Sequence, residues 1–256
     1  DINLTPYSIW LATVVVSGIS YLSYLLKRYV FHESGVLVSG IIGGLYSSTA
    51  TISVLARKSR KASEQEANEY VAAMLLAVSM MFLRFMILIL IFSREIFTSI
   101  YPYLLIMSVV AAVVAWFIHS RHRRSKDMTD ESEDEDSSNP LEFKVALIFA
   151  TLFVVFTVLT HYTLVYAGTG GLNLLSFVSG LSDITPFILN LLQNTGSVAV
   201  LVVVACSMQA IISNILVNMF YALFFAGKGS KLRPWILGGF GTVIGVNLVL
   251  LLFFYL

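Results

Sequence analysis

A cluster of hydroxyl side chains inside a hydrophobic segment is the first candidate for chemistry in this sequence. Four hydroxyls occur within five residues, directly after two glycines, which are poor helix formers: Gly43, Gly44, Ser47, Ser48, Thr49 and Thr51. If the chain unwinds here, the freed backbone carbonyls and the hydroxyls can bind an ion or a substrate group. The alternative is structural, because such hydroxyls also bond back to their own helix, and small residues allow close packing.

Two charged residues lie unusually deep in hydrophobic segments: the carboxylate Asp183 and the basic residue Arg84. A charge inside a bilayer costs about 2.5–3.5 kcal/mol on insertion scales, so each residue is a functional candidate. With Thr185 and carbonyls freed by a helix break, Asp183 predicts an oxygen-rich site for Na⁺, Mg²⁺ or a proton, and it is the candidate metal ligand. Arg84 can bind an anion at a helix start formed by Ser47 to Thr49, gate a pathway, or pair structurally with Asp183.

Amide side chains recur at helical spacing in the second half of the chain. Asn190 belongs to one such stripe, and Asn214 and Asn218 belong to another. These amides can line a water-filled path or coordinate a partly dehydrated cation, but they also join neighbouring helices at about 0.6 kcal/mol each. All three are candidate ion-binding residues, with the structural alternative open.

The elements that must hold these residues are predicted from composition. The chain is 57% hydrophobic and 12% charged, whereas soluble domains carry about a quarter charged residues. Hydrophobic runs of the roughly 20 residues needed to cross a bilayer occur about eight times, at 8–26, 36–56, 70–92, 100–118, 143–165, 172–192, 197–225 and 234–256. The sequence therefore predicts an all-α polytopic protein of about eight transmembrane helices, with the lipid bilayer as its partner.

An internal repeat relates two of these segments. Residues 35–50 and 171–186 share one pattern of small and polar residues at a constant offset, and this pattern aligns Ser47 with Asp183. Both segments are built to interrupt a helix. With an offset that differs by several positions, the 70–92 segment also aligns with the 197–225 segment.

We therefore predict two four-helix repeats, at residues 1–118 and 141–256, joined by a charged cytoplasmic linker at 119–140. Eight full crossings would make the repeats parallel, whereas a re-entrant segment would invert them. A weak excess of Lys and Arg on one side favours both termini and the linker in the cytoplasm.

Several classes of function are not expected. No Ser/His/Asp or Cys/His arrangement predicts an enzyme, the histidines lack metal-ligand spacing, and no cofactor is predicted. The net charge of +1 and an acidic run at 130–136 argue against a nucleic-acid partner. Glycine pairs at four-residue spacing, Gly40 with Gly44 and Gly241 with Gly245, predict helix-packing faces and a homodimer.

Several motifs resemble a prokaryotic membrane domain of unknown function that is often found C-terminal to an MgtC/SapB-like domain. They are Pro6–Trp10, Ser17–Ser20, Gly43–Thr51, Leu55–Arg57, Phe82–Arg84 and Ser179–Asp183. The resemblance implies a multi-pass protein of the prokaryotic inner membrane, an N-terminal MgtC-like domain as partner, and a loose link to magnesium or phosphate homeostasis. Ile184–Pro186 replaces a further acidic residue of that pattern, which weighs against a tight divalent-cation site.

Two functions from different classes follow. The first is an ion channel or ion-coupled transporter, with a cation favoured and a Mg²⁺, Na⁺ or H⁺ link, whose site lies at the bilayer midplane between the repeats. It predicts a water-filled cavity that reaches Ser47 to Thr51 and Asp183. The second is a regulatory or scaffolding membrane protein related to MgtC-type ion homeostasis, which predicts a closed interior with Arg84 and Asp183 paired.

Overall fold

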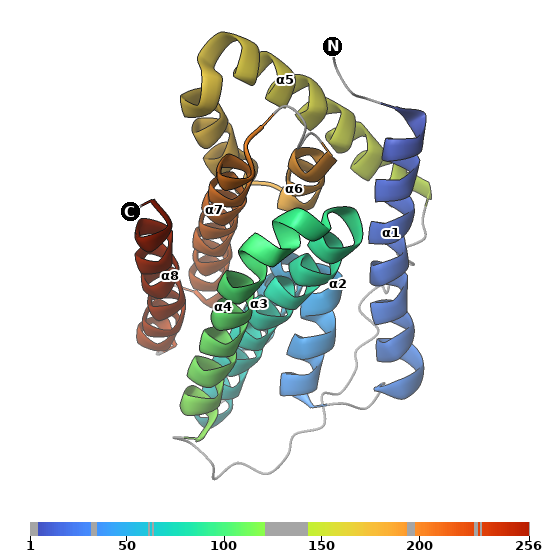
Figure 1. The fold of residues 1–256 in the computed structure, drawn as a ribbon. Helices are drawn as coiled ribbons and strands as arrows, with labels where there is room; N and C mark the ends of the chain where they lie inside the picture. The colour runs from blue at the N-terminus through green and yellow to red at the C-terminus, as the bar shows by residue number, and fades with distance from the viewer. Residues whose placement is uncertain are drawn as a thin grey trace.

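The computed structural model describes residues 5–31, 35–60, 62, 64–120, 143–193, 198–227, 230 and 232–255. The elements within these residues are helices (Figure 1). In chain order they are α1 (Pro6–Leu25), which continues as a short π-helix η1 (Leu26–Val30), α2 (Val36–Lys58), α3 (Glu64–Phe92), α4 (Arg94–Ser120), α5 (Phe143–Ser179), α6 (Ile184–Gln193), α7 (Val200–Ala226) and α8 (Arg233–Tyr255). The predicted all-α fold is confirmed. Most of the predicted charged linker lies outside the described residues.

Seven of the described helices are long and apolar enough to cross a membrane. The remaining helix, α6, has only 10 residues. The expected sixth crossing at 172–192 is therefore wrong as a single helix, because it consists of the end of α5, a turn at 180–183 and α6. Pro186 fits the first turn of α6, where a missing N–H is not needed for helical hydrogen bonds.

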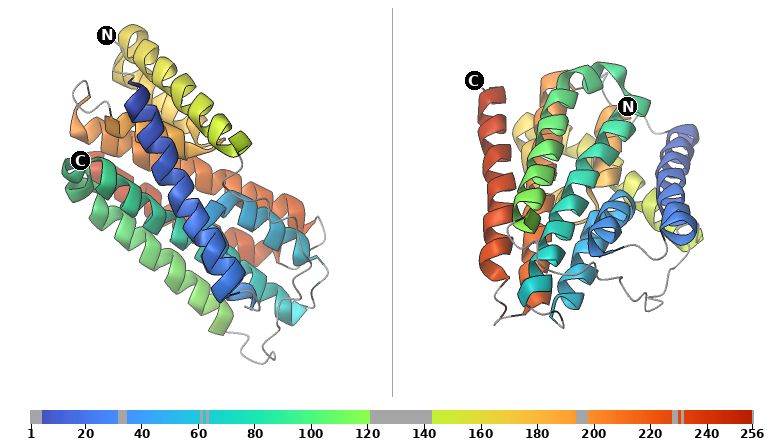
Figure 2. Two further views of the ribbon diagram at one scale, coloured as in Figure 1. Left: turned by 90° about the vertical axis from the view of Figure 1, so that its right-hand side faces the viewer. Right: turned by 90° about the horizontal axis from the view of Figure 1, so that it is seen from below.

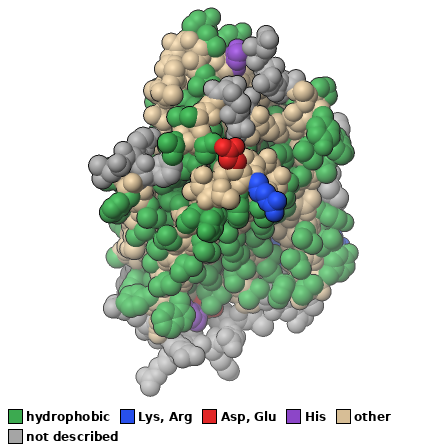
Figure 3. Space-filling view, viewed as in Figure 1, with side chains coloured by type: hydrophobic (Ala, Val, Ile, Leu, Met, Phe, Trp, Pro, Cys, Tyr) green, Lys and Arg blue, Asp and Glu red, His purple; other side chains and the backbone are tan. Residues whose placement is uncertain are grey.

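The outer surface of the protein is apolar. Trp116, Tyr166 and Phe253 are 67%, 82% and 74% exposed. Hydrophobic side chains cover most of the face drawn in Figure 3, and the charged side chains visible there are few. A surface of this kind is stable against lipid rather than water, as expected for a multi-pass membrane protein.

Helix α2 folds back on itself. Ser47 has extended backbone angles, φ −157° and ψ 107°, within an otherwise helical segment. A Cβ placed on Gly43 would lie 2.5 Å from Thr51 Oγ1, although residues eight apart in a straight helix are separated by about 12 Å. The two arms, 36–46 and 48–58, therefore form a re-entrant hairpin with its tip at Ser47.

A second hairpin follows in the other half of the chain. Helix α5 is broken at Gly168, whose φ of +60° and ψ of −151° are accessible almost only to glycine. The arm after this break, 169–179, runs alongside α7 in the same direction, because Asn173 contacts Cys206 and Phe177 contacts Ser213. After the turn, α6 runs back toward the end of the molecule where α5 is broken (Figure 1).

The two hairpins enter the molecule from opposite ends. At one end, Arg60, just after α2, donates to the carbonyl of Phe224 near the end of α7. At the other end, Gln193, the last residue of α6, donates to the carbonyl of Ser8 near the start of α1. Each half thus consists of a helix, a hairpin and two further helices, and the second half runs in the opposite direction. The sequence left parallel and inverted repeats open, and the structure has the inverted arrangement.

The orientation expected from loop charge changes with this topology. Tyr103, in the first half of α4, contacts Asn247, in the second half of α8, whereas Ile118, near the end of α4, lies close to Gly239, near the start of α8. Helices α4 and α8 are therefore antiparallel, so the end of α4 and the end of α8 lie at opposite ends of the molecule. The expectation that the linker and the C-terminus share one side is wrong, because a hairpin returns the chain to the side from which it came.

The close contacts also fix the register of the repeat. Gly44 packs on Ala77 of α3, and Gly180 packs on Ser213 of α7. The two partners are separated by the same number of positions as the two glycines. The constant offset therefore extends into the next helix, and the shifted alignment of α3 with α7 expected from the sequence is not the one that the contacts support.

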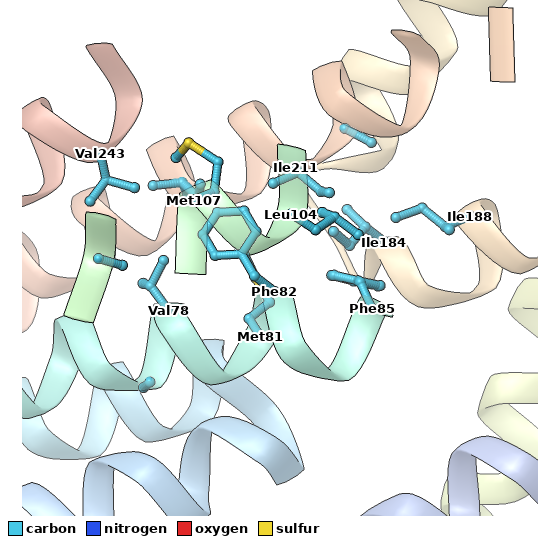
Figure 4. Packing of buried hydrophobic residues seen from close by; sticks show 14 of the residues in the cluster. Val78, Met81, Phe82, Phe85, Leu104, Met107, Ile184, Ile188, Ile211 and Val243 are labelled. Atoms are coloured by element: carbon cyan, nitrogen blue, oxygen red, sulfur yellow. The ribbon is translucent and has the colours of Figure 1, made fainter. Parts of the chain in front are cut away.

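Helices α3 and α7 form the centre of the bundle. Half of the α3 span and 67% of the α7 span are buried, whereas only 17% of the α1 span is buried. In Figure 4, Phe82 of α3 lies among apolar side chains from α4, α6, α7 and α8, and it is fully buried. Helix α1 lies at the edge of the bundle and contacts α5 (Figure 2).

Candidate functional site

The two hairpin tips have matching helix caps. Ser47 Oγ accepts a hydrogen bond of 3.3 Å from the backbone N–H of Ala50, at the start of the second α2 arm. Asp183 Oδ1 accepts one of 2.9 Å from the backbone N–H of Thr185, at the start of α6. The residues that the repeat aligns thus have the same local role, because side-chain oxygens satisfy the orphan N–H groups of a helix start. They differ in charge.

Arg84 of α3 connects the two tips. Its Nη1 donates a hydrogen bond of 2.7 Å to the carbonyl of Tyr46, the last residue of the first α2 arm. Its Nη2 donates one of 3.3 Å to Thr185 Oγ1 in the first turn of α6. A guanidinium at the C-terminal end of a helix is favourable because that end carries a partial negative charge. The Asp183 carboxylate also attracts the guanidinium electrostatically, but these two hydrogen bonds go to neutral oxygens.

A cavity of about 360 Å³ lies where the tips meet. Both hairpins contribute to its wall, together with α1, α3, the first part of α5, and α7. The polar lining residues are Ser17, Ser20, Tyr46, Ser47, Ser48, Thr49, Arg84, Ser182, Asp183, Thr185, Asn214 and Tyr221. Apolar residues such as Phe85, Phe149 and Leu152 complete the wall. The molecule therefore gathers polar groups around one cavity in a fold whose exterior is mostly apolar.

Most of the candidate residues found in the sequence come together here. Ser47, Ser48, Thr49, Arg84, Asp183, Thr185 and Asn214 line this one cavity. Ser48 is buried, whereas Asp183 is exposed. Asn214 Nδ2 donates to the carbonyls of Gly180 and Ser182, at 3.3 and 3.4 Å, and so holds the second tip against α7.

Three candidates do not line the cavity. Thr51 lies between the two arms of α2, against Gly43. Asn190 donates a hydrogen bond of 2.6 Å to Thr157 on α5, and Asn218 donates one of 3.2 Å to Asn214 Oδ1. Asn190 thus joins α6 to α5, and Thr51 packs one arm of α2 on the other, whereas the bond of Asn218 lies within α7.

Five polar lining residues were not among the sequence candidates: Ser17 and Ser20 on α1, Tyr46, Ser182, and Tyr221 on α7. The two serines of α1 are three residues apart, which places them on one face of a helix, and this spacing was the available signal. Tyr221 follows Asn214 by seven residues, which is also helical spacing, whereas Tyr46 carried no such signal.

The charge of the lining is balanced and sparse. Arg84 and Asp183 are its ionisable residues apart from two tyrosines. Within the described part of the chain, no three His, Cys, Asp or Glu residues are grouped closely enough to hold a metal ion. Asp183 therefore has no acidic neighbour in the cavity with which to form a divalent-cation cage, and a single carboxylate suits a proton or a monovalent cation better.

These features define a multi-pass α-helical membrane protein with a polar cavity between two oppositely directed, broken hairpins. Residues 14–226 match the family described as "Domain of unknown function (DUF4010)", and the chain belongs to this family. An "Uncharacterized protein" of Aquifex aeolicus (strain VF5) is 27% identical over 221 residues, which cover 85% of this chain and 94% of that protein. No solved structure matches the chain. The resemblance seen in the motifs is thus confirmed at the level of a family of unknown function.

Proposed function

We propose that the protein is an ion-coupled membrane transporter whose binding site is the cavity between the hairpin tips. The observation that carries this proposal is the bridge made by Arg84. One side chain in the centre of the bundle holds the broken end of the first hairpin and the start of α6 in the second, at the wall of one polar cavity.

Polar groups inside a membrane protein are costly unless they have partners. Interrupted helices leave backbone groups without partners, and non-helical backbone at membrane depth is tolerated where it lines a cavity. In transporters built from inverted repeats, such interruptions lie at the substrate and ion sites near the bilayer midplane. The cavity reaches Ser47, Thr49 and Asp183, as a transport pathway requires. A closed interior with Arg84 bonded to Asp183 was the expectation for a scaffold.

Asp183 is the proposed site for the coupling cation. Its Oδ1 atom caps α6, and its exposed side chain leaves Oδ2 to accept a proton or a monovalent cation. Thr185 Oγ1 and the nearby lining hydroxyls are further oxygen ligands. Binding of a cation would neutralise the carboxylate and weaken its attraction for Arg84, which couples the charge at one tip to the contact between the tips.

Flux measurements on the purified full chain in proteoliposomes test this function. We expect flux of H⁺, Na⁺ or K⁺ that falls strongly in Asp183→Asn and in Ser47→Ala. Glu95→Gln and Thr151→Ala are matched controls, because both residues are exposed and neither lines the cavity. Unchanged flux in both cavity variants would exclude this pathway. A wild-type protein that carries no ion, Mg²⁺ and anions included, would instead favour the regulatory or scaffolding role.

The setting of the transporter is part of the same proposal. We infer a prokaryotic inner membrane, an MgtC/SapB-like domain as a partner, and a homodimer. The bacterial relative is consistent with the first. Cross-linking of the protein in native membranes checks the dimer, which fails if only monomers are recovered.

A further inference from the structure

We propose that the cavity binds a small oxyanion at the first hairpin tip, with Arg84 and the start of the second α2 arm as its ligands. The inference rests on the transport function proposed above and names its substrate class. It divides the cavity into an anion-binding tip at Ser47 to Thr49 and a cation-binding tip at Asp183.

The charge of Arg84 is only partly neutralised, because the Asp183 carboxylate attracts the guanidinium but accepts neither of its two hydrogen bonds. Its two hydrogen bonds go to a backbone carbonyl and a hydroxyl, which carry no formal charge. Its Nε atom is buried and has no hydrogen-bond partner. A guanidinium in a membrane interior normally lies against a carboxylate or another anion, and it offers five N–H donors suited to planar or tetrahedral oxyanions.

The first tip is also a source of hydrogen-bond donors. The second α2 arm begins at this tip, and a helix start directs free N–H groups and a partial positive charge at whatever lies in front of it. Ser47 caps only the N–H of Ala50, and it does so with a neutral hydroxyl. Ser48 and Thr49, the first residues of this arm, are both part of the cavity lining.

The second tip differs from the first in its charge and in its donors. The start of α6 is already capped by a carboxylate, Asp183, through the N–H of Thr185. The next residue, Pro186, has no N–H to donate. An anion would meet repulsion and few donors there. The two tips share one backbone design, and their side chains give them opposite preferences for charge.

The size of the cavity agrees with a small ligand. Its volume of about 360 Å³ is near the lower limit of ligand pockets, which is roughly 300 Å³. Part of that space borders apolar residues such as Phe85 and Leu152, which would exclude water around a bound ion. The chemistry therefore fits a phosphate, a sulfate or a short carboxylate rather than a large organic substrate.

Equilibrium binding to the detergent-solubilised full chain tests the inference separately from transport. The thermal unfolding midpoint is measured against increasing sodium phosphate, sodium sulfate and sodium succinate, with sodium chloride at matched ionic strength as reference. We expect a saturable rise with at least one oxyanion. In Arg84→Lys, which keeps the charge but loses the planar donor set, the apparent Kd should rise at least about tenfold.

Two further variants make the result specific. Thr49→Val removes a lining hydroxyl at nearly constant shape and should weaken anion binding, even if Arg84→Lys does not fold. Arg94→Gln removes an exposed charge outside the cavity and should bind like the wild type. A midpoint that no oxyanion raises, or apparent Kd values unchanged in both Arg84→Lys and Thr49→Val, overturns the inference. Cation flux without anion binding overturns only the oxyanion site, whereas anion binding without any flux overturns only the transport function.

Discussion

Replacement of Gly44 by alanine is the sharpest test of the hairpin geometry. A Cβ at Gly44 would lie 2.5 Å from Ala77 Cα and 2.7 Å from Ala77 O, both backbone atoms of α3. Because non-bonded carbon atoms are about 3.5–4.0 Å apart at their optimum, the arm would have to move away from α3 by about 1 Å. Overpacking of this kind costs about 1–3 kcal/mol.

The same replacement also has a favourable effect, because alanine stabilises a helix by about 0.8–1.0 kcal/mol relative to glycine. Gly241 of α8 is the matched control, since a Cβ there would meet no atom within 4 Å. Both variants gain the helix preference, so the difference between them isolates the overpacking term. We expect Gly44→Ala to be less stable than Gly241→Ala by about 1–3 kcal/mol.

The assay is reversible unfolding of the purified protein in increasing dodecyl sulfate, followed by circular dichroism. Gly44→Ala should also reduce flux, because Tyr46, two residues further along, would move away from Arg84, and a bond of 2.7 Å has little tolerance for a shift of about 1 Å. Equal free energies of unfolding for the two alanine variants would refute the close approach of the first α2 arm to α3, and with it the hairpin geometry.

Three further variants test the contact between α4 and α8, the break in α5 and the second hairpin tip. Tyr103→Phe should lower the free energy of unfolding by about 1–3 kcal/mol in the same dodecyl sulfate titration, because it leaves the fully buried Asn247 without its hydroxyl partner. A loss of stability no larger than that of Tyr7→Phe, at an exposed tyrosine, would contradict this prediction. Gly168→Ala should lower the free energy of unfolding by about 1–3 kcal/mol, because the backbone here has a positive φ, although nothing lies within 4 Å of the new Cβ. A stability equal to that of Gly241→Ala would count against a helix break at Gly168. Asn214→Ala should loosen the tip at Gly180 and Ser182 and reduce flux, while anion binding through Arg84 persists. Flux and binding assays on one preparation separate the two effects. Full flux would show that the hydrogen bonds of the Asn214 amide do not position Asp183.

Part of the site could be predicted because its signals are local. A charged residue among apolar neighbours is conspicuous in any hydrophobic run, so Arg84 and Asp183 were identifiable without knowledge of their surroundings. The segment around Ser47 was identifiable for a similar reason, since glycines followed by several Ser and Thr residues have a low helix propensity. Asn190 shows the limit of this reasoning, because an amide at helical spacing can face a cavity or, as Asn190 does, a neighbouring helix, and the spacing is the same in both cases.

The sequence by itself determined the all-α membrane fold, the two interrupted segments and the correspondence of Ser47 with Asp183, because hydrophobicity, helix breaking and repeat patterns are written along the chain. Only the tertiary structure decided that the interrupted segments are hairpins, that the halves are inverted, and that Arg84 bonds to both tips. The physical reason is that an interruption shows where a helix can bend but not by how much. The bend at Ser47 is fixed by the contacts of Gly43 with Thr51 and of Gly44 with Ala77, and these contacts exist only in the folded chain.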